Sequence, residues 1–217
     1  MKLINTILFD LDGTLVDTAP DLGYALNLQL QRHGRASLDD AVIRPFASHG
    51  SRGLIGLGFG ITPDDANFLA LRDEYLALYD TVFTRSPVLL AGIAELLQAI
   101  ENKGLKWGIV TNKPRRFTQR LIESMDLHKR AACVVSGDDA PQPKPSPATL
   151  RLASEQIGVK SEQCLYVGDA ERDVQAGKAA GMKTVVALFG YIDVTDKPSE
   201  WGADALIETP NALLDLI

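Results

Sequence analysis

Residues 6–14 read TILFDLDGT, and this stretch decides the fold. Residues 6–9 form a continuous apolar run that ends at Asp10, and Gly13 then interrupts the chain. A short apolar run bounded by a turn signal is typical of a strand that is buried on both faces. The stretch therefore predicts a core strand whose carboxyl end carries two carboxylates, Asp10 and Asp12.

After residue 87, short apolar runs alternate with amphipathic stretches of helical periodicity. The runs predicted as strands are 107–110, 133–135, 164–167, 184–188 and 205–207. The stretches predicted as helices are 93–103, 116–125, 148–157 and 172–180, with a last short helix at 211–216. Such alternation is typical of right-handed βαβ units on a parallel sheet. The sequence therefore predicts an α/β fold with a Rossmann-like parallel sheet.

The segment between the first strand and this alternating pattern has a different character. Helical periodicity runs through 20–33, 39–46 and 64–82, while the glycine-rich stretch 50–60 is compatible with helix or loop. We therefore predict two parts. They are an α/β core of residues 1–17 and 87–217, and an inserted all-helical cap of residues 18–86.

The composition is that of an ordinary globular chain, with 217 residues, 46% hydrophobic and 23% charged. The formal net charge of −6 and the lack of a long basic run argue against binding to nucleic acid or to an acidic membrane surface. No stretch approaches the ~18–20 apolar residues of a membrane span, and the first residues do not resemble a signal peptide. We expect a cytoplasmic protein that is a monomer or a weak dimer, with Cys133 and Cys164 as buried free thiols.

Polar and acidic side chains follow the predicted strands at the edge where the carboxyl ends of parallel strands meet, which is where such folds bind ligands. They are Asp10, Asp12 and Thr14 after the first strand, Thr111 and Asn112 after the second, Lys144 before a helix, and Asp169 and Asp173 after 164–167. Several carboxylates in one cleft repel one another unless a cation is present, and Mg²⁺ suits carboxylate and phosphate oxygens. With a lysine and a hydroxyl beside them, the set fits phosphoryl transfer to a carboxylate nucleophile.

Each of these residues also has an ordinary structural explanation. An Asp-Leu-Asp-Gly stretch is often a turn after a strand, and a Thr-Asn pair is often a helix cap. Lys144 alone is compatible with a solvated surface charge, and Asp169 and Asp173 are compatible with acidic residues at a helix amino terminus. Their joint occurrence at successive strand ends favours the functional interpretation.

The ordered set resembles the four motifs of the haloacid dehalogenase superfamily. The motif residues are Asp10-x-Asp12-Gly13-Thr14, Thr111-Asn112, Lys144-Pro145 and Gly168-Asp169-x-x-x-Asp173. The resemblance implies that Asp10 is the nucleophile and that Asp12 is the general acid and base. It also implies that Thr111 and Lys144 hold the phosphate. The implied ligands of Mg²⁺ are Asp10, the backbone carbonyl of Asp12, Asp169 and, directly or through water, Asp173.

Features of this chain discriminate between branches of the superfamily. The insertion after the first motif is similar to the helical cap of the phosphoglycolate phosphatase and β-phosphoglucomutase branch. Dehalogenases and phosphonatases lack an aspartate that matches Asp12, so its presence favours a phosphatase. Thr14 stands where mutases often carry valine, which favours hydrolysis, and Thr14 and Asn112 are candidate substrate-binding residues. A sugar-phosphate mutase of the β-phosphoglucomutase type and a non-catalytic binding module are the alternatives.

In this branch the cap selects the leaving group, and the tract 48–53 lies where related caps face the active site. Arg52 can pair with a carboxylate through two hydrogen bonds, and His49 and Ser51 beside it are further candidate substrate-binding residues. A solvent-facing arginine is the alternative. The stretch 107–114 resembles bacterial proteins grouped with phosphoglycolate phosphatases, including N-acetylmuramic acid 6-phosphate phosphatases. The resemblance implies a small carboxylate-bearing phosphate ester as substrate: N-acetylmuramic acid 6-phosphate, a compound of cell-wall recycling, or 2-phosphoglycolate.

Overall fold

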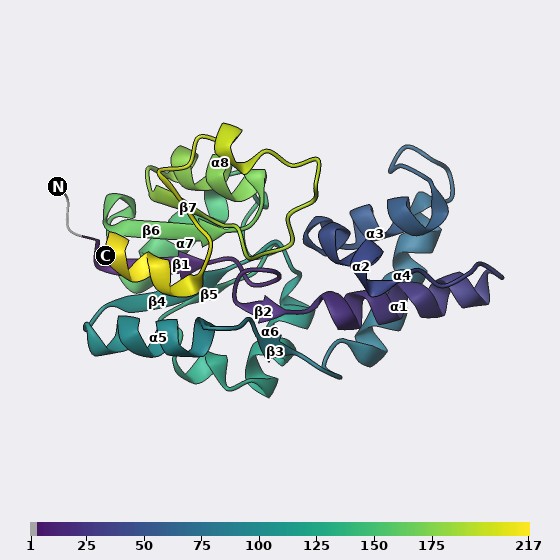
Figure 1. Cartoon of the computed structure of the whole chain (residues 1–217), viewed down its shortest axis with the longest axis horizontal. Helices are drawn as coiled ribbons and strands as arrows, with labels where there is room; N and C mark the ends of the chain where they lie inside the picture. Colours follow the sequence, from purple (N-terminus) through teal and green to yellow (C-terminus); the bar gives the residue numbers. More distant parts are fainter. Residues whose placement is uncertain (1–3) are drawn as a thin grey trace.

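The computed structural model describes residues 4–217, and a parallel sheet forms its core (Figure 1). The strands of this sheet are β1 (Thr6–Phe9), β4 (Lys106–Val110), β5 (Val134–Val135), β6 (Cys164–Gly168), β7 (Lys183–Ala187) and β8 (Ala205–Ile207). Their spatial order is β5-β4-β1-β6-β7-β8. Within it, Phe9 of β1 lies opposite Ile109 of β4 and Val167 of β6. This register brings the residues that follow these three strands to one edge, as predicted.

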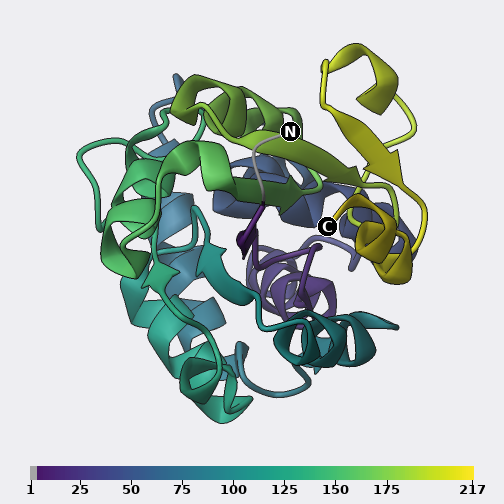
Figure 2. The same ribbon diagram turned by 90° about the vertical axis from the view of Figure 1, so that its left-hand side faces the viewer.

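Helices cover both faces of the sheet (Figures 1 and 2). They are α5 (Ile93–Asn102) and α6 (Arg115–Ser124) on one face, and α7 (Ala148–Ile157) and α8 (Glu171–Ala180) on the other. Ile7 and Phe9 of β1 belong to the hydrophobic cluster that contains α5 and α6, whereas Leu8 belongs to the cluster that contains α7 and α8. Because both faces are buried, β1 carries apolar side chains on both, which explains its continuous apolar run.

The insertion folds as a helical layer at one end of the molecule, on the right in Figure 1. Its helices are α1 (Ala19–Arg32), α2 (Asp40–Ile43), α3 (Gly50–Phe59) and α4 (Phe68–Val82), with a 3-10 helix at Arg44–His49. Helices α1 and α4 pack against each other, and the Tyr75 hydroxyl of α4 donates to the Leu22 carbonyl of α1 at 3.2 Å. The predicted α/β core with an inserted helical cap is therefore confirmed.

A short antiparallel ribbon lies where the chain leaves the core for the cap and where it returns. It pairs β2 (Val16–Asp17) with β3 (Val88–Leu89). Next to it, the N–H of Leu90 donates to the Leu15 carbonyl at 2.9 Å. Strands this short carry no readable periodicity, so the sequence did not predict them. The exact division of the chain at residues 18 and 86 stays a prediction.

The glycine-rich stretch 50–60, which was compatible with helix or loop, forms the helix α3. Gly58 faces α1 so closely that an added Cβ would lie 2.9 Å from Leu26 Cδ1. Glycine at this position therefore lets α3 and α1 approach each other, which offsets its poor intrinsic helix propensity.

Helix α4 begins at Phe68, four residues after the predicted start at residue 64. The Asp65 carboxylate accepts hydrogen bonds from the N–H and Oγ1 of Thr62, at 2.7 and 2.9 Å, and these bonds close a turn ahead of the helix. At the other end of the chain, the last predicted helix is a 3-10 helix at Pro210–Leu216.

Within residues 4–217, no helix combines the length and the apolar character that a membrane crossing requires. Cys133 and Cys164 are free and buried, as predicted. Burial raises the pKa of the Cys133 thiol to about 12 and that of Cys164 to about 11. Both thiols therefore stay protonated at neutral pH and act as small apolar side chains.

Candidate active site

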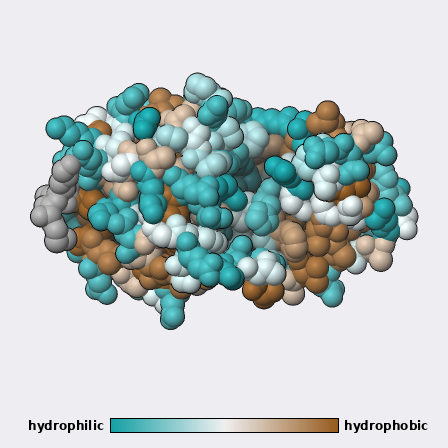
Figure 3. Space-filling view, turned by 90° about the horizontal axis from the view of Figure 1, so that it is seen from above, coloured by the Kyte–Doolittle hydropathy of each residue, from teal (hydrophilic) through white to brown (hydrophobic). Residues whose placement is uncertain are grey.

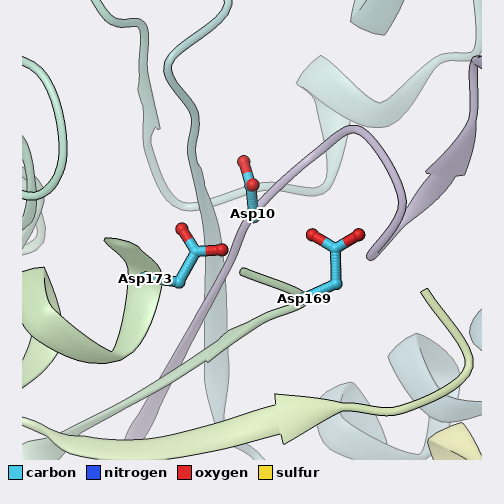
Figure 4. Close-up of side chains that lie close together, drawn as sticks. All are labelled: Asp10, Asp169 and Asp173. Atoms are coloured by element: carbon cyan, nitrogen blue, oxygen red, sulfur yellow. The ribbon is translucent and has the colours of Figure 1, made fainter. Parts of the chain in front are cut away.

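Three carboxylates meet at the carboxyl edge of the sheet (Figure 4). Asp10 follows β1, Asp169 follows β6, and Asp173 lies in the first turn of α8. All three are buried, and one oxygen of each lies within 4.8 Å of the others. The backbone holds Asp10 in place, because its N–H donates to the Val167 carbonyl at 2.9 Å and its Oδ1 accepts the N–H of Leu11 at 2.8 Å.

Lys144 bridges two of these carboxylates. Its Nζ lies 3.0 Å from Asp10 Oδ1 and 2.8 Å from Asp173 Oδ1, and it also donates to the Tyr166 hydroxyl at 2.8 Å. The Asn112 side chain fixes the backbone of Lys144, since it donates to the Lys144 carbonyl at 2.9 Å and accepts the Lys144 N–H at 2.8 Å. Asn112, predicted to bind substrate, thus positions the lysine.

Burial and neighbouring charges set the acid–base state of the cluster. Burial raises the pKa of Asp10, and the charge of Lys144 opposes that rise. For Asp173 burial acts the same way, but Lys144 and Arg172 outweigh it and hold the pKa below its usual value. Burial and the charges of Asp10 and Asp173 raise the pKa of Asp169 to about 8. The cluster is therefore fully ionised at neutral pH only with further positive charge beside it.

The donor set fits a hard divalent cation. Asp169 Oδ2 accepts the N–H of Tyr191 at 2.8 Å, but Asp169 Oδ1 is buried and has no hydrogen-bond partner among residues 4–217. A buried carboxylate oxygen without a partner, beside two other carboxylates, is the kind of ligand set that Mg²⁺ accepts. Asp10, Asp169 and Asp173 are the residues that could hold it.

The Asp12 carboxylate has different partners. Its Oδ1 accepts a hydrogen bond from Thr18 Oγ1 at 2.6 Å and from Lys113 Nζ at 2.9 Å. Asp12 and Asp10 both face the space between core and cap. The metal role predicted for Asp12 concerns its backbone carbonyl and stays a prediction.

A cavity of about 1180 Å³ opens between the core and the cap, and Figure 3 shows the surface hollowed between these two parts. The core contributes Asp10, Asp12, Thr111, Asn112, Lys113 and Arg172 to its wall. Lys144, Asp169 and Asp173 are buried and do not line it. Thr14, predicted to bind substrate, is fully buried and does not line it either.

The cap brings its three predicted substrate residues, His49, Ser51 and Arg52, to the same cavity. Arg52 is exposed and lies in the first turn of α3, where it can reach a ligand. Burial, helped by the charge of Arg172, lowers the pKa of His49, so its ring is neutral at neutral pH. The apolar part of the wall includes Leu22, Phe46, Leu57, Tyr75, Leu76 and Tyr79.

Three cationic side chains of the cavity wall had no predicted role. Lys113 directly follows Asn112, and Arg172 directly precedes Asp173. Because both residues are next to motif residues, they could have been considered as site residues. The sequence does not show, however, whether their side chains point into the cavity. Arg72 of α4 lines the cavity from the cap and had no signal at all.

The sequence model of the haloacid dehalogenase-like hydrolases matches residues 7–187 of this chain. A protein of Xanthomonas campestris pv. campestris named phosphoglycolate phosphatase is 40% identical over 213 residues, which cover 98% of this chain and 96% of that protein. A protein of Pseudomonas aeruginosa named N-acetylmuramic acid 6-phosphate phosphatase is 37% identical over 217 residues, which cover 99% of this chain and 95% of that protein. Both similarities include the cap as well as the core.

Solved structures share the fold. The crystal structure of a predicted phosphoglycolate phosphatase from Haemophilus somnus matches with a TM-score of 0.84 at 23% identity, covering 98% of this chain and 97% of that one. A haloacid dehalogenase-like family protein from Streptococcus pneumoniae matches with a TM-score of 0.85 at 21% identity, covering 100% and 99%. From its motifs, its fold and its relatives, this chain is a phosphoric monoester hydrolase that belongs to the haloacid dehalogenase-like hydrolase family.

Proposed function

We propose that this hydrolase cleaves a small phosphate ester that carries a carboxylate, in a Mg²⁺-dependent reaction that passes through a phosphorylated Asp10. One observation carries the proposal. The Asp10 carboxylate lines the cavity, and the buried Lys144 Nζ lies 3.0 Å from it. A carboxylate that attacks an anionic phosphoryl group needs fixed positive charge of this kind to offset the charge that accumulates.

The reaction then runs in two steps. A carboxylate oxygen of Asp10 bonds to phosphorus while the bond from phosphorus to the leaving oxygen breaks, and Asp12 gives that oxygen its proton. In the second step the Asp12 carboxylate takes a proton from water, whose oxygen attacks phosphorus and releases phosphate from Asp10. Thr111 and Lys144 orient the phosphoryl oxygens, and the ammonium group of Lys144 offsets their negative charge. Asp10, Asp169 and Asp173 would hold Mg²⁺, which would supply positive charge to offset the charge of the phosphoryl group.

The size of the cavity supports the larger of the two candidate substrates. Its volume of about 1180 Å³ is far more than a glycolate group fills, and ligand pockets typically measure ~300–1,000 Å³. Arg52 offers a partner for a carboxylate, and Leu57, Tyr75 and Leu76 offer apolar surface for an acetylated sugar. We therefore favour N-acetylmuramic acid 6-phosphate, with 2-phosphoglycolate as the second candidate, and the two relatives bear these two names.

In this proposal residues 18–86 act as a cap that closes over the bound ester, while residues 1–17 and 87–217 carry the reaction. The ribbon of β2 and β3 lies at the two crossing points between these parts, where a hinge would be placed. Closure excludes water during the first step and brings the cap's selecting residues to the leaving group.

A substrate panel tests the proposal. Purified protein with Mg²⁺ is given N-acetylmuramic acid 6-phosphate, 2-phosphoglycolate and N-acetylglucosamine 6-phosphate, and released phosphate is measured. The last compound is the first without its lactyl ether, the group that carries the carboxylate, so a clearly higher kcat/KM for the muramic compound is expected. Equal turnover of the two sugar phosphates contradicts recognition of the carboxylate. Isomerisation of a sugar phosphate without release of free phosphate would instead identify a mutase.

A further inference from the structure

Lys113 is the cation in closest contact with the Asp12 carboxylate. Its Nζ lies 2.9 Å from Asp12 Oδ1, and its side chain is only 5% exposed against 17% for that of Asp12. The backbone of the lysine is fixed, because its N–H donates to Thr111 Oγ1 at 3.1 Å and its carbonyl accepts Thr118 Oγ1 at 3.1 Å. The ammonium group therefore reaches Asp12 from a rigid starting point at the end of β4.

Both partners of the Asp12 carboxylate contact the same oxygen. Thr18 Oγ1 donates to Oδ1 at 2.6 Å, and Lys113 approaches that oxygen too. Two contacts from separate parts of the chain on one oxygen restrict the rotation of the carboxylate. They also leave Oδ2 as the oxygen that can carry a proton to a ligand in the cavity, which Asp12 lines.

The cap holds the other side of the ammonium. Lys113 Nζ lies 4.9 Å from the centre of the Tyr79 ring, which comes from α4 and is 2% exposed. The Tyr79 ring itself packs against the rings of Tyr75 of the cap and Phe117 of the core, with distances between ring centres of 6.1 and 5.2 Å. A cation over a buried ring is attracted to its face. Lys113 is thus held between a core carboxylate and a cap ring.

Stability alone gives little reason for a lysine at this position. Burying an ion pair costs about as much as the pair returns, and apolar residues of similar size often replace such pairs without loss. By contrast, a proton donor that must meet a particular oxygen of the substrate gains directly from a fixed orientation.

We propose that Lys113 is a positioning residue that orients Asp12 for proton transfer. It holds Oδ1, so that the proton on Oδ2 goes to the leaving oxygen as the bond from phosphorus to that oxygen breaks. In the second step the same oxygen takes the proton of the attacking water. The Tyr79 ring keeps the ammonium in place while the cap lies against the core. This inference rests on the role of Asp12 in the proposed function.

The first test compares leaving groups. The Lys113→Met protein is mixed with an excess of one of two kinds of ester. The first is an alkyl phosphate, either N-acetylmuramic acid 6-phosphate or 2-phosphoglycolate, and the second is p-nitrophenyl phosphate. The rate at which the leaving group is released in the first step is measured for each. An alkoxide needs a proton to leave and p-nitrophenolate does not. We therefore expect the rate with the alkyl ester to fall roughly 10–100-fold, and the p-nitrophenol burst to fall by no more than about threefold. Equal losses on both esters would overturn the inference.

The second test asks whether Lys113 acts through Asp12. The double variant Asp12→Asn, Lys113→Met is expected to release the alkyl leaving group about as slowly as Asp12→Asn alone, because the lysine then has no donor to orient. Losses that multiply would show that Lys113 acts independently and would overturn the inference.

Controls separate folding and function from this effect. Lys129→Met removes a solvent-exposed ion pair with Asp126 and should leave all rates unchanged. If Lys113→Met does not fold by circular dichroism, Lys113→Gln is used instead. It keeps a neutral donor at the same site, so a smaller loss that is confined to the alkyl ester is expected, and equal losses on both esters contradict the inference. Wild-type protein that releases no phosphate from any ester would instead overturn the proposed function itself.

Discussion

Arg172 of the core and Ser48 of the cap are joined by two hydrogen bonds, from Arg172 Nη2 to the Ser48 carbonyl at 2.7 Å and to Ser48 Oγ at 2.9 Å. Burial alone would lower the pKa of Arg172, but the charges of Asp173, Asp10 and Asp169 outweigh it and raise the pKa. The guanidinium therefore stays charged, and it joins the start of α8, which carries Asp173, to the cap tract 48–53 that carries Arg52.

Replacing Arg172 should weaken the contact between the core and the cap. A hydrogen bond from a charged group is worth roughly 1.5–3 kcal/mol, so Arg172→Met should lower kcat/KM for the carboxylate ester by about 10–150-fold. Ser48→Ala should cost much less, because the 2.7 Å bond to the backbone carbonyl remains. Steady-state kinetics with the same ester measures both.

A matched control exists on the core surface. Arg151 Nη2 donates to the Ala179 carbonyl at 2.9 Å in an exposed position, and Arg151 does not line the cavity. Arg151→Met should leave kcat/KM unchanged. If Arg172→Met behaves like Arg151→Met, the contact with Ser48 does not contribute to catalysis.

Arg52 should distinguish esters by their carboxylate. Arg52→Ala should reduce kcat/KM for a carboxylate-bearing ester by about 10–150-fold, the worth of a charged hydrogen bond. Activity on p-nitrophenyl phosphate, which has no carboxylate, should change far less. Arg35→Ala, at another exposed arginine of the cap, is the control. Equal losses on both substrates in Arg52→Ala would assign the arginine to the phosphoryl group or to cap closure.

The raised pKa of Asp169 predicts how pH and Mg²⁺ act together. In the folded chain this pKa is about 8, against an ordinary value of 3.8. Folding therefore favours the protonated form, so metal-free protein should lose stability as the pH rises from about 4 toward about 8. In the proposed function protons and Mg²⁺ compete for the Asp169 carboxylate, so the apparent affinity for Mg²⁺ should fall up to about tenfold per pH unit below this pKa.

Thermal unfolding measures this coupling. The rise in Tm on adding Mg²⁺ should be larger at pH 8 than at pH 6, and Asp169→Asn should remove most of the difference. A rise in Tm that is the same at both pH values would show that Asp169 is already ionised in the metal-free protein.

The strand ends could be read from the sequence because one physical rule places them. Continuous apolar runs are typical of parallel strands that are buried on both faces. The residues that follow such strands lie at one edge of the sheet, and this rule located Asp10, Thr111 and Asp169. Side-chain direction has no such rule. Asn112, predicted to bind substrate, lines the cavity and also holds the Lys144 backbone, whereas Thr14, predicted to bind substrate too, is fully buried.

The cap was harder to predict for physical reasons. Glycines weaken the helical signal of α3, and only close packing against Leu26 explains why Gly58 is tolerated there. The contacts from Arg172 to Ser48 and from Lys113 to Asp12 join residues 124 and 101 positions apart. Contacts between residues so far apart in the sequence depend on the completed fold, so they could not be predicted from this sequence alone.

The central claim is that a carboxylate oxygen of Asp10 attacks phosphorus and takes up the phosphoryl group. Wild-type protein is mixed with Mg²⁺ and excess ester, quenched in acid within the first turnover, and digested, and the peptide that contains Asp10 is examined by mass spectrometry. We predict one added phosphoryl group on Asp10 in the wild type, and neither that group nor phosphate release in a folded Asp10→Asn variant. An Asp10→Asn protein that keeps a sizeable share of wild-type turnover would contradict the account.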